Sequence, residues 1–409
     1  MRILLFCNSR MCARRLTAMK KYTVLFLMTA ALIFSGCHNT DTASPVPTAV
    51  AEGSTAEVVT ERTFPASEEY VKLTGRTAEV DGIRWLIHSA SKIEFKLKGT
   101  HASAVIRSDD SINGEEEHLA RVAVYVNGER TLDHIVRQEE ETIELFSSEE
   151  EKEVEIAIIK LSEAAHSIVG IKEIQVTAAS DIAPLPEKDI KIEFIGDSVT
   201  CGYGVDDEDP THDFSTATED ATKTYAYKTA EALNADYSMV AYSGYGIVSG
   251  YTADGTKEET MLVPPVYESL GKNNGSADGI LDLSRDWDFR DFVPDEIVIN
   301  LGTNDATYTL HDAAREAEFV SLYVDFLKTV RRDNPDARIT ASLGVMNDNL
   351  YPAVEKAVTQ YIAETGDENI SSLHFTPQDG STGYAADGHP TEATHALAAK
   401  TLIEHLRHN

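Results

Sequence analysis

Apolar and polar residues alternate along the part of the chain that follows residue 64. Three runs, residues 93–97, 122–126 and 154–158, place apolar side chains at every second position. The middle run leads into Asn127-Gly128, a pair that favours the tight turn of a β-hairpin. A period of two predicts strands with one buried face. We therefore expect residues 65–180 to fold as an all-β sandwich.

The pattern changes across a short linker, residues 181–189, that contains Ala183-Pro184-Leu185-Pro186. Beyond it, short apolar runs alternate with longer stretches of helical period. The predicted strands are residues 190–195, 237–242, 296–300 and 339–345, and the predicted helices are residues 222–233, 313–330, 353–364 and 391–406. This alternation predicts a three-layer α/β/α domain with a parallel sheet over residues 190–409. Such sheets bind ligands at the carboxyl ends of their strands.

The N-terminal residues have the features of an export signal. Lys20 and Lys21 precede an apolar run over residues 22–34, which is short for a membrane span. Met19 already begins a complete signal, so we expect it to be the true start. Residues 1–36 are then expected to be removed as a signal peptide.

Cys37 follows this signal in a sequence that resembles a bacterial lipobox. We expect Cys37 to carry a lipid anchor, which is the only contact with a membrane that the sequence predicts. The protein would be extracytoplasmic, and simply secreted if the lipobox is not used. Residues 37–64, rich in Thr, Ala, Pro, Ser and Glu, are expected to form a flexible tether. Cys201 is the only other cysteine after processing, so no disulfide is expected.

The composition narrows the class of protein. With 409 residues the chain is long enough for two domains plus tails. Its net charge of −32 disfavours nucleic-acid binding, which needs clustered Lys and Arg, and favours a solvated surface. We expect a monomer. Neither a zinc-site spacing nor a phosphate-binding loop is found in the sequence, so we expect no metal and no cofactor.

Three polar segments each stand at a predicted strand end: Gly196-Asp197-Ser198-Val199, Gly302-Thr303-Asn304-Asp305 and Asp387-Gly388-His389-Pro390. Acyl transfer needs a hydroxyl beside N–H groups that can hold an oxyanion, and Ser198 at a helix start would have them. The alternative is that Ser198 merely caps the helix. His389 is the expected general base for Ser198. The segment around Ser198 is not the G-x-S-x-G elbow, which disfavours the α/β-hydrolase fold.

Asn304 and Gly244 could add donors for an oxyanion. The Asn304 side chain has amide N–H groups, and Gly244 could bring its backbone N–H close to a substrate. The alternatives are a turn residue and an ordinary loop glycine. Cys201 has no base of its own and is expected to be structural. His395 is expected to be a packing or surface residue.

These segments resemble the four blocks of the SGNH (GDSL-like) hydrolase superfamily. Further stretches are similar to carbohydrate esterase family 2, the acetylxylan-esterase-like enzymes that join an N-terminal jelly-roll to an SGNH domain: residues 73–76, 192–204, 218–220, 287–289 and 298–305. The resemblance covers about residues 65–409. It implies Ser198 as nucleophile and His389 as general base. The oxyanion hole it implies consists of the Ser198 N–H, the Gly244 N–H and the Asn304 side-chain amide.

The last segment departs from the superfamily at two positions. Many members have the acid that orients the imidazole three residues before the His, where this chain has Ala386; Asp387 is two before it. Either Asp387 completes a triad, or a backbone carbonyl orients the ring in a Ser-His dyad. The family also often has Trp directly before the His, where Gly388 stands here. Tyr384 or Tyr245 could replace that aromatic surface.

The sequence therefore predicts an extracytoplasmic serine esterase that removes O-acetyl groups from polysaccharides or oligosaccharides through an acetyl-enzyme. One alternative is a lipid or thioester hydrolase on the same fold, which would need an apolar acyl pocket. Another is a non-catalytic carbohydrate-binding surface lipoprotein. Against the latter, an idle domain has no reason to hold Ser198, Asn304 and His389 together.

Overall fold

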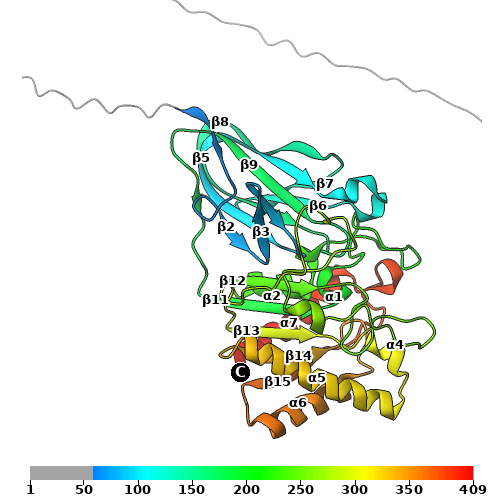
Figure 1. Cartoon of the computed structure of the whole chain (residues 1–409). Coiled ribbons are helices and arrows are strands. Elements are labelled where there is room, and N and C mark those ends of the chain that lie inside the picture. The colour runs from blue at the N-terminus through cyan, green and yellow to red at the C-terminus, as the bar shows by residue number, and fades with distance from the viewer. Residues whose placement is uncertain (1–58, 409) are drawn as a thin grey trace, which may run out of the picture. The chain divides into compact units, whose positions relative to one another are not determined.

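The computed structural model describes residues 59–408. The expected signal peptide, lipobox and Cys37 lie outside the described residues. Within the described range, an antiparallel β domain is followed by an α/β domain with a parallel sheet (Figure 1). The fold class predicted from the period-two pattern and from the alternation after residue 190 is confirmed.

The β domain is one curled antiparallel sheet in which the strands follow the path β3-β4-β9-β5-β8-β6-β7. Its two long strands, of 17 and 21 residues, pair with each other, and shifts of register near Gly99 let the sheet bend around an apolar core. The strands are β1 (Thr60–Phe64), β2 (Lys72–Thr74), β3 (Thr77–Val80), β4 (Ile83–Leu86), β5 (Lys92–Ser108), β6 (Arg121–Val126), β7 (Glu129–Ile135), β8 (Glu140–Lys160), β9 (Val169–Ala178) and β10 (Ala183–Pro184).

The turn between β6 and β7 forms where the sequence predicts it. Asn127 and Gly128 have φ angles of 52° and 80°, the left-handed pair that a type I′ hairpin turn requires. At the two ends of the domain, the sheet extends further than the alternating runs. β1 lies inside the stretch expected to be tether and pairs with β9, and β10 lies inside the expected linker and pairs with β5.

The α/β domain contains five parallel strands in the order β12-β11-β13-β14-β15. They are β11 (Ile190–Gly196), β12 (Ala235–Ala241), β13 (Glu296–Asn300), β14 (Arg338–Leu343) and β15 (Ile370–His374), and the helices are α1 (Ser198–Cys201), α2 (Tyr225–Ala232), α3 (Pro264–Tyr267), α4 (Asp305–Thr309), α5 (Ala313–Asp333), α6 (Tyr351–Thr365) and α7 (Glu392–His408). The sequence did not predict β15, because this edge strand is polar and only half-buried.

Alternate residues of each central strand face opposite layers. Ile297 and Ile299 belong to the core shared with α5 and α6, whereas Val298 belongs to the core shared with α2 and α7. Helices therefore cover both faces of the sheet, and the strands read as continuous apolar runs because both faces are buried. This is the three-layer arrangement that the sequence predicts.

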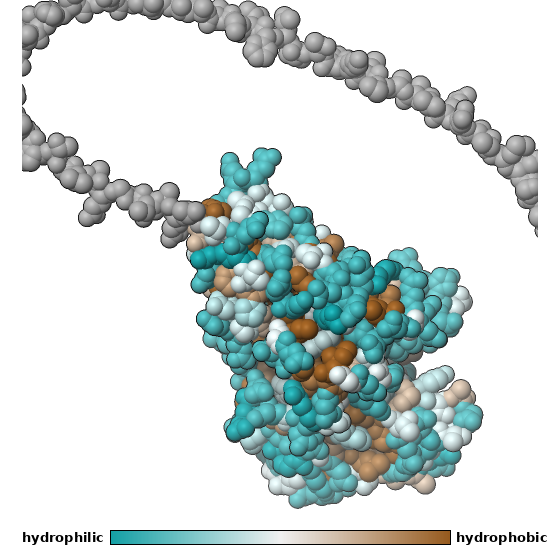
Figure 2. Space-filling view, turned by 45° about the horizontal axis from the view of Figure 1, so that its top comes forward, coloured by the Kyte–Doolittle hydropathy of each residue, from teal (hydrophilic) through white to brown (hydrophobic). Residues whose placement is uncertain are grey.

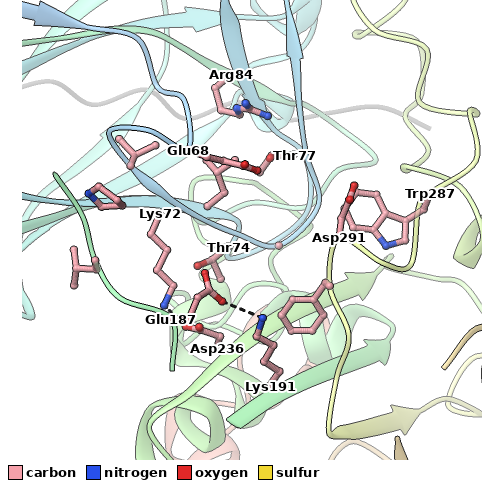
Figure 3. Close-up of a pocket in the computed structure, with 16 residues that line it drawn as sticks. Glu68, Lys72, Thr74, Thr77, Arg84, Glu187, Lys191, Asp236, Trp287 and Asp291 are labelled. Atoms are coloured by element: carbon pink, nitrogen blue, oxygen red, sulfur yellow. Dashed lines mark hydrogen bonds and ion pairs between the residues drawn. The ribbon is translucent and has the colours of Figure 1, made fainter. Parts of the chain in front are cut away.

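The two domains share buried contacts. Arg76 of the β domain is fully buried, and its guanidinium donates to the Tyr267 carbonyl at 2.6 Å and lies 5.1 Å from the Trp287 ring. A cavity of about 610 Å³ lies at this junction. Figure 3 shows the residues that line it. They include the buried ion pair Lys72–Asp236, with 2.6 Å between Nζ and Oδ1. Because Asp236 stands near the start of β12, this cavity lies at the amino ends of the strands, opposite the edge that carries Ser198.

Hydrophilic side chains cover most of the face seen in Figure 2. This agrees with the acidic composition of the chain. Among residues 59–408, every helix is either too short or too polar to cross a lipid bilayer.

Candidate active site

Ser198 is the first residue of α1 and follows β11 directly. The cap of this helix is the preceding residue, since the Asp197 carboxylate accepts the Val199 N–H at 3.0 Å. Ser198 is therefore not the capping residue, which removes the alternative interpretation of its position. Its own N–H is among the first amides of the helix, which have no partner within the helix and point toward the space ahead of it.

His389 lies in the loop before α7, 191 residues further along the chain. Its Nε2 is 2.9 Å from Oγ of Ser198, and its Nδ1 is 3.2 Å from the carbonyl oxygen of Ala386. A carbonyl oxygen can only accept, so this contact places the ring proton on Nδ1. The lone pair of Nε2 then faces the Ser198 hydroxyl, as a general base requires.

The Asp387 carboxylate makes no hydrogen bond to the imidazole, although its charge acts on the ring. The backbone of this residue has the left-handed angles φ 51° and ψ 30°, and its side chain is exposed. The carboxylate instead accepts a weak hydrogen bond from the Tyr203 hydroxyl at 3.4 Å. The position of Asp387 two residues before His389, in a tight turn, thus leaves the Ala386 carbonyl as the group that contacts Nδ1.

Burial sets the protonation state of His389. It lowers the pKa of the imidazole to about 4, while the backbone carbonyls of Ala386 and Asp387 and the charge of Asp387 act in the opposite direction and are weaker. The ring is therefore neutral near pH 7. A neutral imidazole beside a hydroxyl can accept its proton, which is the property a general base needs.

Gly244 and Asn304 stand at the same edge of the sheet. Gly244 has φ 80°, and a Cβ at this position would come within 2.6 Å of the Met261 methyl group. The positive φ favours glycine at this position, and a side chain would also require the end of Met261 to move. The Asn304 side-chain nitrogen donates to the Tyr245 carbonyl at 2.8 Å and lies 3.5 Å from Oδ2 of Asp197. Since an amide has two N–H groups, the second is held only by this long contact.

Asp305 holds the loop that follows Gly244, a role that the sequence analysis missed. Its Oδ1 accepts the backbone N–H groups of Ile247, Val248 and Ser249 at 3.0, 2.7 and 3.1 Å. Burial raises the pKa of this carboxyl to about 6, although the three amides favour its charged form. The available signal was its place as the last residue of Gly-Thr-Asn-Asp.

Tyr203 is a second residue that sequence reasoning missed. Its ring stacks on the His389 imidazole. The Phe214 ring packs against the Tyr203 ring, with 4.8 Å between their centroids. The aromatic residues considered as substitutes for the missing Trp differ in position. Tyr245 is buried against Tyr242, whereas Tyr384 is 39% exposed.

Two further residues have surroundings that suit the structural roles expected of them. Cys201 is fully buried, and burial raises the pKa of its thiol well above the ordinary value. His395 is buried in α7 and accepts the Tyr225 N–H at 3.2 Å. Among residues 59–408, one group brings three potential metal-ligand atoms within 4.8 Å of one another: Glu163, Cys201 and Glu219.

The fold and the residues at its carboxyl edge are those of an SGNH-type hydrolase. Residues 192–402 match the family model described as GDSL-like Lipase/Acylhydrolase, and residues 73–186 match the model described as Carbohydrate esterase 2 N-terminal. The chain belongs to the GDSL-like lipase/acylhydrolase family and, with its N-terminal β domain, to carbohydrate esterase family 2.

Known relatives agree with this assignment. The cellulase/esterase CelE of Acetivibrio thermocellus is 31% identical over 78% of this chain, which spans 37% of that protein. An acetylxylan esterase / glucomannan deacetylase of Cellvibrio japonicus is 26% identical over 95% of this chain and 99% of its own length.

Two solved structures also match over most of their length. A family two carbohydrate esterase from Clostridium thermocellum, in complex with cellohexaose, has a TM-score of 0.72 and 30% identity, covering 83% of this chain and 98% of its own. The acetyl xylan esterase Est2A of Butyrivibrio proteoclasticus has a TM-score of 0.77 and 26% identity, covering 86% of this chain and 98% of its own.

Proposed function

We propose that this protein is an extracytoplasmic serine esterase that removes O-acetyl groups from polysaccharides or oligosaccharides. The observation that carries the proposal is the 2.9 Å contact between Nε2 of His389 and Oγ of Ser198, at the carboxyl edge of the parallel sheet. The names of the relatives, which include acetylxylan esterases and a glucomannan deacetylase, support the acetylated glycan as substrate. The N-terminal signal supports export, either as a lipoprotein anchored at Cys37 or in secreted form.

In the first half of the reaction, Ser198 attacks the carbonyl carbon of the acetyl ester while His389 takes the hydroxyl proton on Nε2. The tetrahedral oxyanion is held by the Ser198 N–H, the Gly244 N–H and the second N–H of Asn304. His389 then gives its proton to the sugar oxygen, which leaves as the alcohol. An acetyl-enzyme on Ser198 remains.

In the second half, His389 removes a proton from water, and the hydroxide attacks the acetyl-enzyme. Collapse of the second tetrahedral intermediate releases acetate and returns the proton to Ser198. The Ala386 carbonyl keeps Nδ1 protonated throughout, so His389 and Ser198 act as a dyad in which no carboxylate contacts the ring.

Two variants test the mechanism on an aryl acetate. Ser198→Ala and His389→Ala should each abolish hydrolysis while the melting temperature stays close to that of the parent. Retained turnover by Ser198→Ala would refute Ser198 as the nucleophile. Release of acetate from acetylated xylan, mannan and simple sugars then ranks the glycans.

A lipid or thioester hydrolase on the same fold is the competing function, because the matching family model also includes lipases. A series of aryl esters with increasing acyl length separates the two. A rate that falls beyond acetate supports deacetylation, and a rate that rises with chain length supports the lipase.

A further inference from the structure

The β domain places one carboxylate inside the α/β domain, behind the residues of the proposed oxyanion hole. Glu163 lies in the connection between β8 and β9 and is fully buried. Its Oε2 accepts the backbone N–H of Ser243 at 2.9 Å and lies 3.9 Å from Sγ of Cys201. We propose that Glu163 is a positioning residue, supplied by the β domain, that aligns the two backbone donors of the oxyanion hole with each other.

The two groups that Glu163 contacts are directly linked to those donors. Ser243 immediately precedes Gly244, so the peptide unit that donates the Gly244 N–H begins at Ser243. Cys201 is the last residue of α1, and Ser198 is the first residue of the same single helical turn. One carboxylate oxygen thus contacts both the loop that carries Gly244 and the helix that carries Ser198. Stabilisation of an oxyanion depends on donors that are fixed before the reaction begins.

The backbone of Glu163 is itself held on both sides. Its N–H donates to Oε2 of Glu219 at 2.8 Å, and its carbonyl accepts from Nζ of Lys160 at 3.0 Å. Glu219 belongs to the α/β domain and Lys160 to the end of β8, and both side chains are fully buried. These two hydrogen bonds fix the backbone of Glu163 and so limit the positions that its carboxylate can take.

The charges of this cluster favour Glu163 as an acceptor. Burial raises the pKa of both carboxyls, and that of Glu219 rises well above its usual range because the Glu163 charge adds to the effect of burial. The Ser243 N–H, the Lys160 ammonium and the Cys201 S–H oppose the effect of burial on Glu163, because each favours its charged form. The Lys160 ammonium thus places a positive charge near Glu163, Cys201 and Glu219, the three residues with potential metal-ligand atoms.

The inference rests on the proposed esterase function, and kinetics on 4-nitrophenyl acetate test it. Glu163→Ala leaves the partly buried Ser243 N–H without its acceptor and frees the Gly244 loop. We expect kcat to fall about 10²-fold, as for the loss of one oxyanion donor, while KM changes less than about threefold. Glu163→Gln keeps a carbonyl oxygen for Ser243 and should restore kcat to within about tenfold of the parent.

Asp109→Ala is the matched control. Asp109 is also a buried β-domain carboxylate, and it accepts from the Ile168 N–H and the Ser276 hydroxyl, both at 2.8 Å, without contacting Ser198, Gly244 or Asn304. Its loss should lower the melting temperature but leave kcat near the parent value. If Glu163→Ala lowers kcat no more than Asp109→Ala does, the inference is wrong.

A variant that keeps the carboxyl group covers the case in which Glu163→Ala does not fold. Glu163→Asp withdraws the carboxylate by one methylene and should have a lower kcat than Glu163→Gln; equal or higher kcat would overturn the proposal. The Ser198→Ala variant separates a failure of the proposed esterase function from a failure of the positioning role. If it stays inactive while Glu163→Ala is fully active, the esterase function stands and only the positioning role fails.

Discussion

The ring of Tyr203 lies flat against the imidazole of His389, with 3.9 Å between the ring centroids and 17° between the planes. In a Ser-His-Asp triad, a buried carboxylate orients the imidazole through Nδ1. Here the Ala386 carbonyl contacts Nδ1 at 3.2 Å, and a carbonyl dipole binds less strongly than a charge. The stacked phenol restricts the same ring from its face. Two contacts therefore orient the imidazole: the Ala386 carbonyl at its edge and the Tyr203 ring on its face.

Removal of the stacked ring should cost activity even though Tyr203 takes no part in proton transfer. We expect Tyr203→Ala to lower kcat/KM for an aryl acetate about tenfold or more, because the imidazole gains freedom to leave its reactive orientation. Tyr203→Phe keeps the ring and loses only the weak hydrogen bond to Asp387, so it should stay within about threefold of the parent. Equal losses in the two variants would mean that the hydroxyl, and not the stacked ring, supports His389.

Asp387 should prove dispensable for the chemistry. We expect Asp387→Asn to lower kcat less than tenfold, whereas loss of a functional triad acid lowers it about 10⁴-fold. Asn is the suitable replacement because it tolerates the left-handed backbone at this position better than Ala. A loss near 10³-fold or greater, in a variant that melts like the parent, would show that the carboxylate orients the ring during the reaction.

The pH profile should follow the pKa of His389. The free enzyme needs the neutral imidazole, and burial lowers the pKa of this group to about 4. Activity is therefore present above that value and lost as the pH falls through it. The acid limb of kcat/KM, which reports the free enzyme, should lie near pH 4 to 5 and well below the ordinary histidine value of about 6.5. A midpoint near pH 6.5 would contradict this environment for His389.

The fold could be predicted because its signals are local. The period-two runs gave the strands of the β domain, and Asn127-Gly128 located a turn that the structure forms. The alternation beyond residue 190 predicted four of the five parallel strands. β15 was not predicted, because Ser371, Ser372 and His374 make its sequence polar. Its place in the sheet depends on pairing with β14. β1 was not predicted either, because it forms a strand only by pairing with β9.

The candidate site was predictable only in part. Ser198 and His389 stand in recognisable segments, and the structure brings them together. The orientation of Asp387 depends on one pair of backbone angles in a tight turn, which the spacing alone did not reveal. Tyr203 lies in the stretch 192–204 that resembles the family, but nothing in that stretch indicates its contact with His389, and Glu163 lies outside all the resembling stretches. Tyr203 acts by stacking on a residue far along the chain, and Glu163 reaches the site from another domain.

Asp305 gives the last prediction, which concerns stability. Asp305→Ala leaves the three amides of Ile247, Val248 and Ser249 without their acceptor. An unsatisfied buried group costs about 1–3 kcal/mol. We therefore expect the free energy of unfolding, measured by chemical denaturation, to fall by about 3 kcal/mol or more. The loop that begins at Gly244 should loosen as well and lower kcat.

Asp305→Asn separates the hydrogen bonds from the charge. Val248 and Ser249 donate to Oδ1 alone, so the amide oxygen of Asn can still accept both N–H groups, whereas the Ile247 N–H lies between the two oxygens, at 3.0 and 3.1 Å. The pKa of Asp305 is raised by burial to about 6. The folded state thus binds the proton more tightly than the unfolded chain, and the stability that this contributes is lost as the pH rises through about 6. The Asn variant lacks this titration, so its melting temperature relative to the parent should rise between about pH 4 and 6. A constant difference across that range would show that Asp305 titrates with its ordinary pKa.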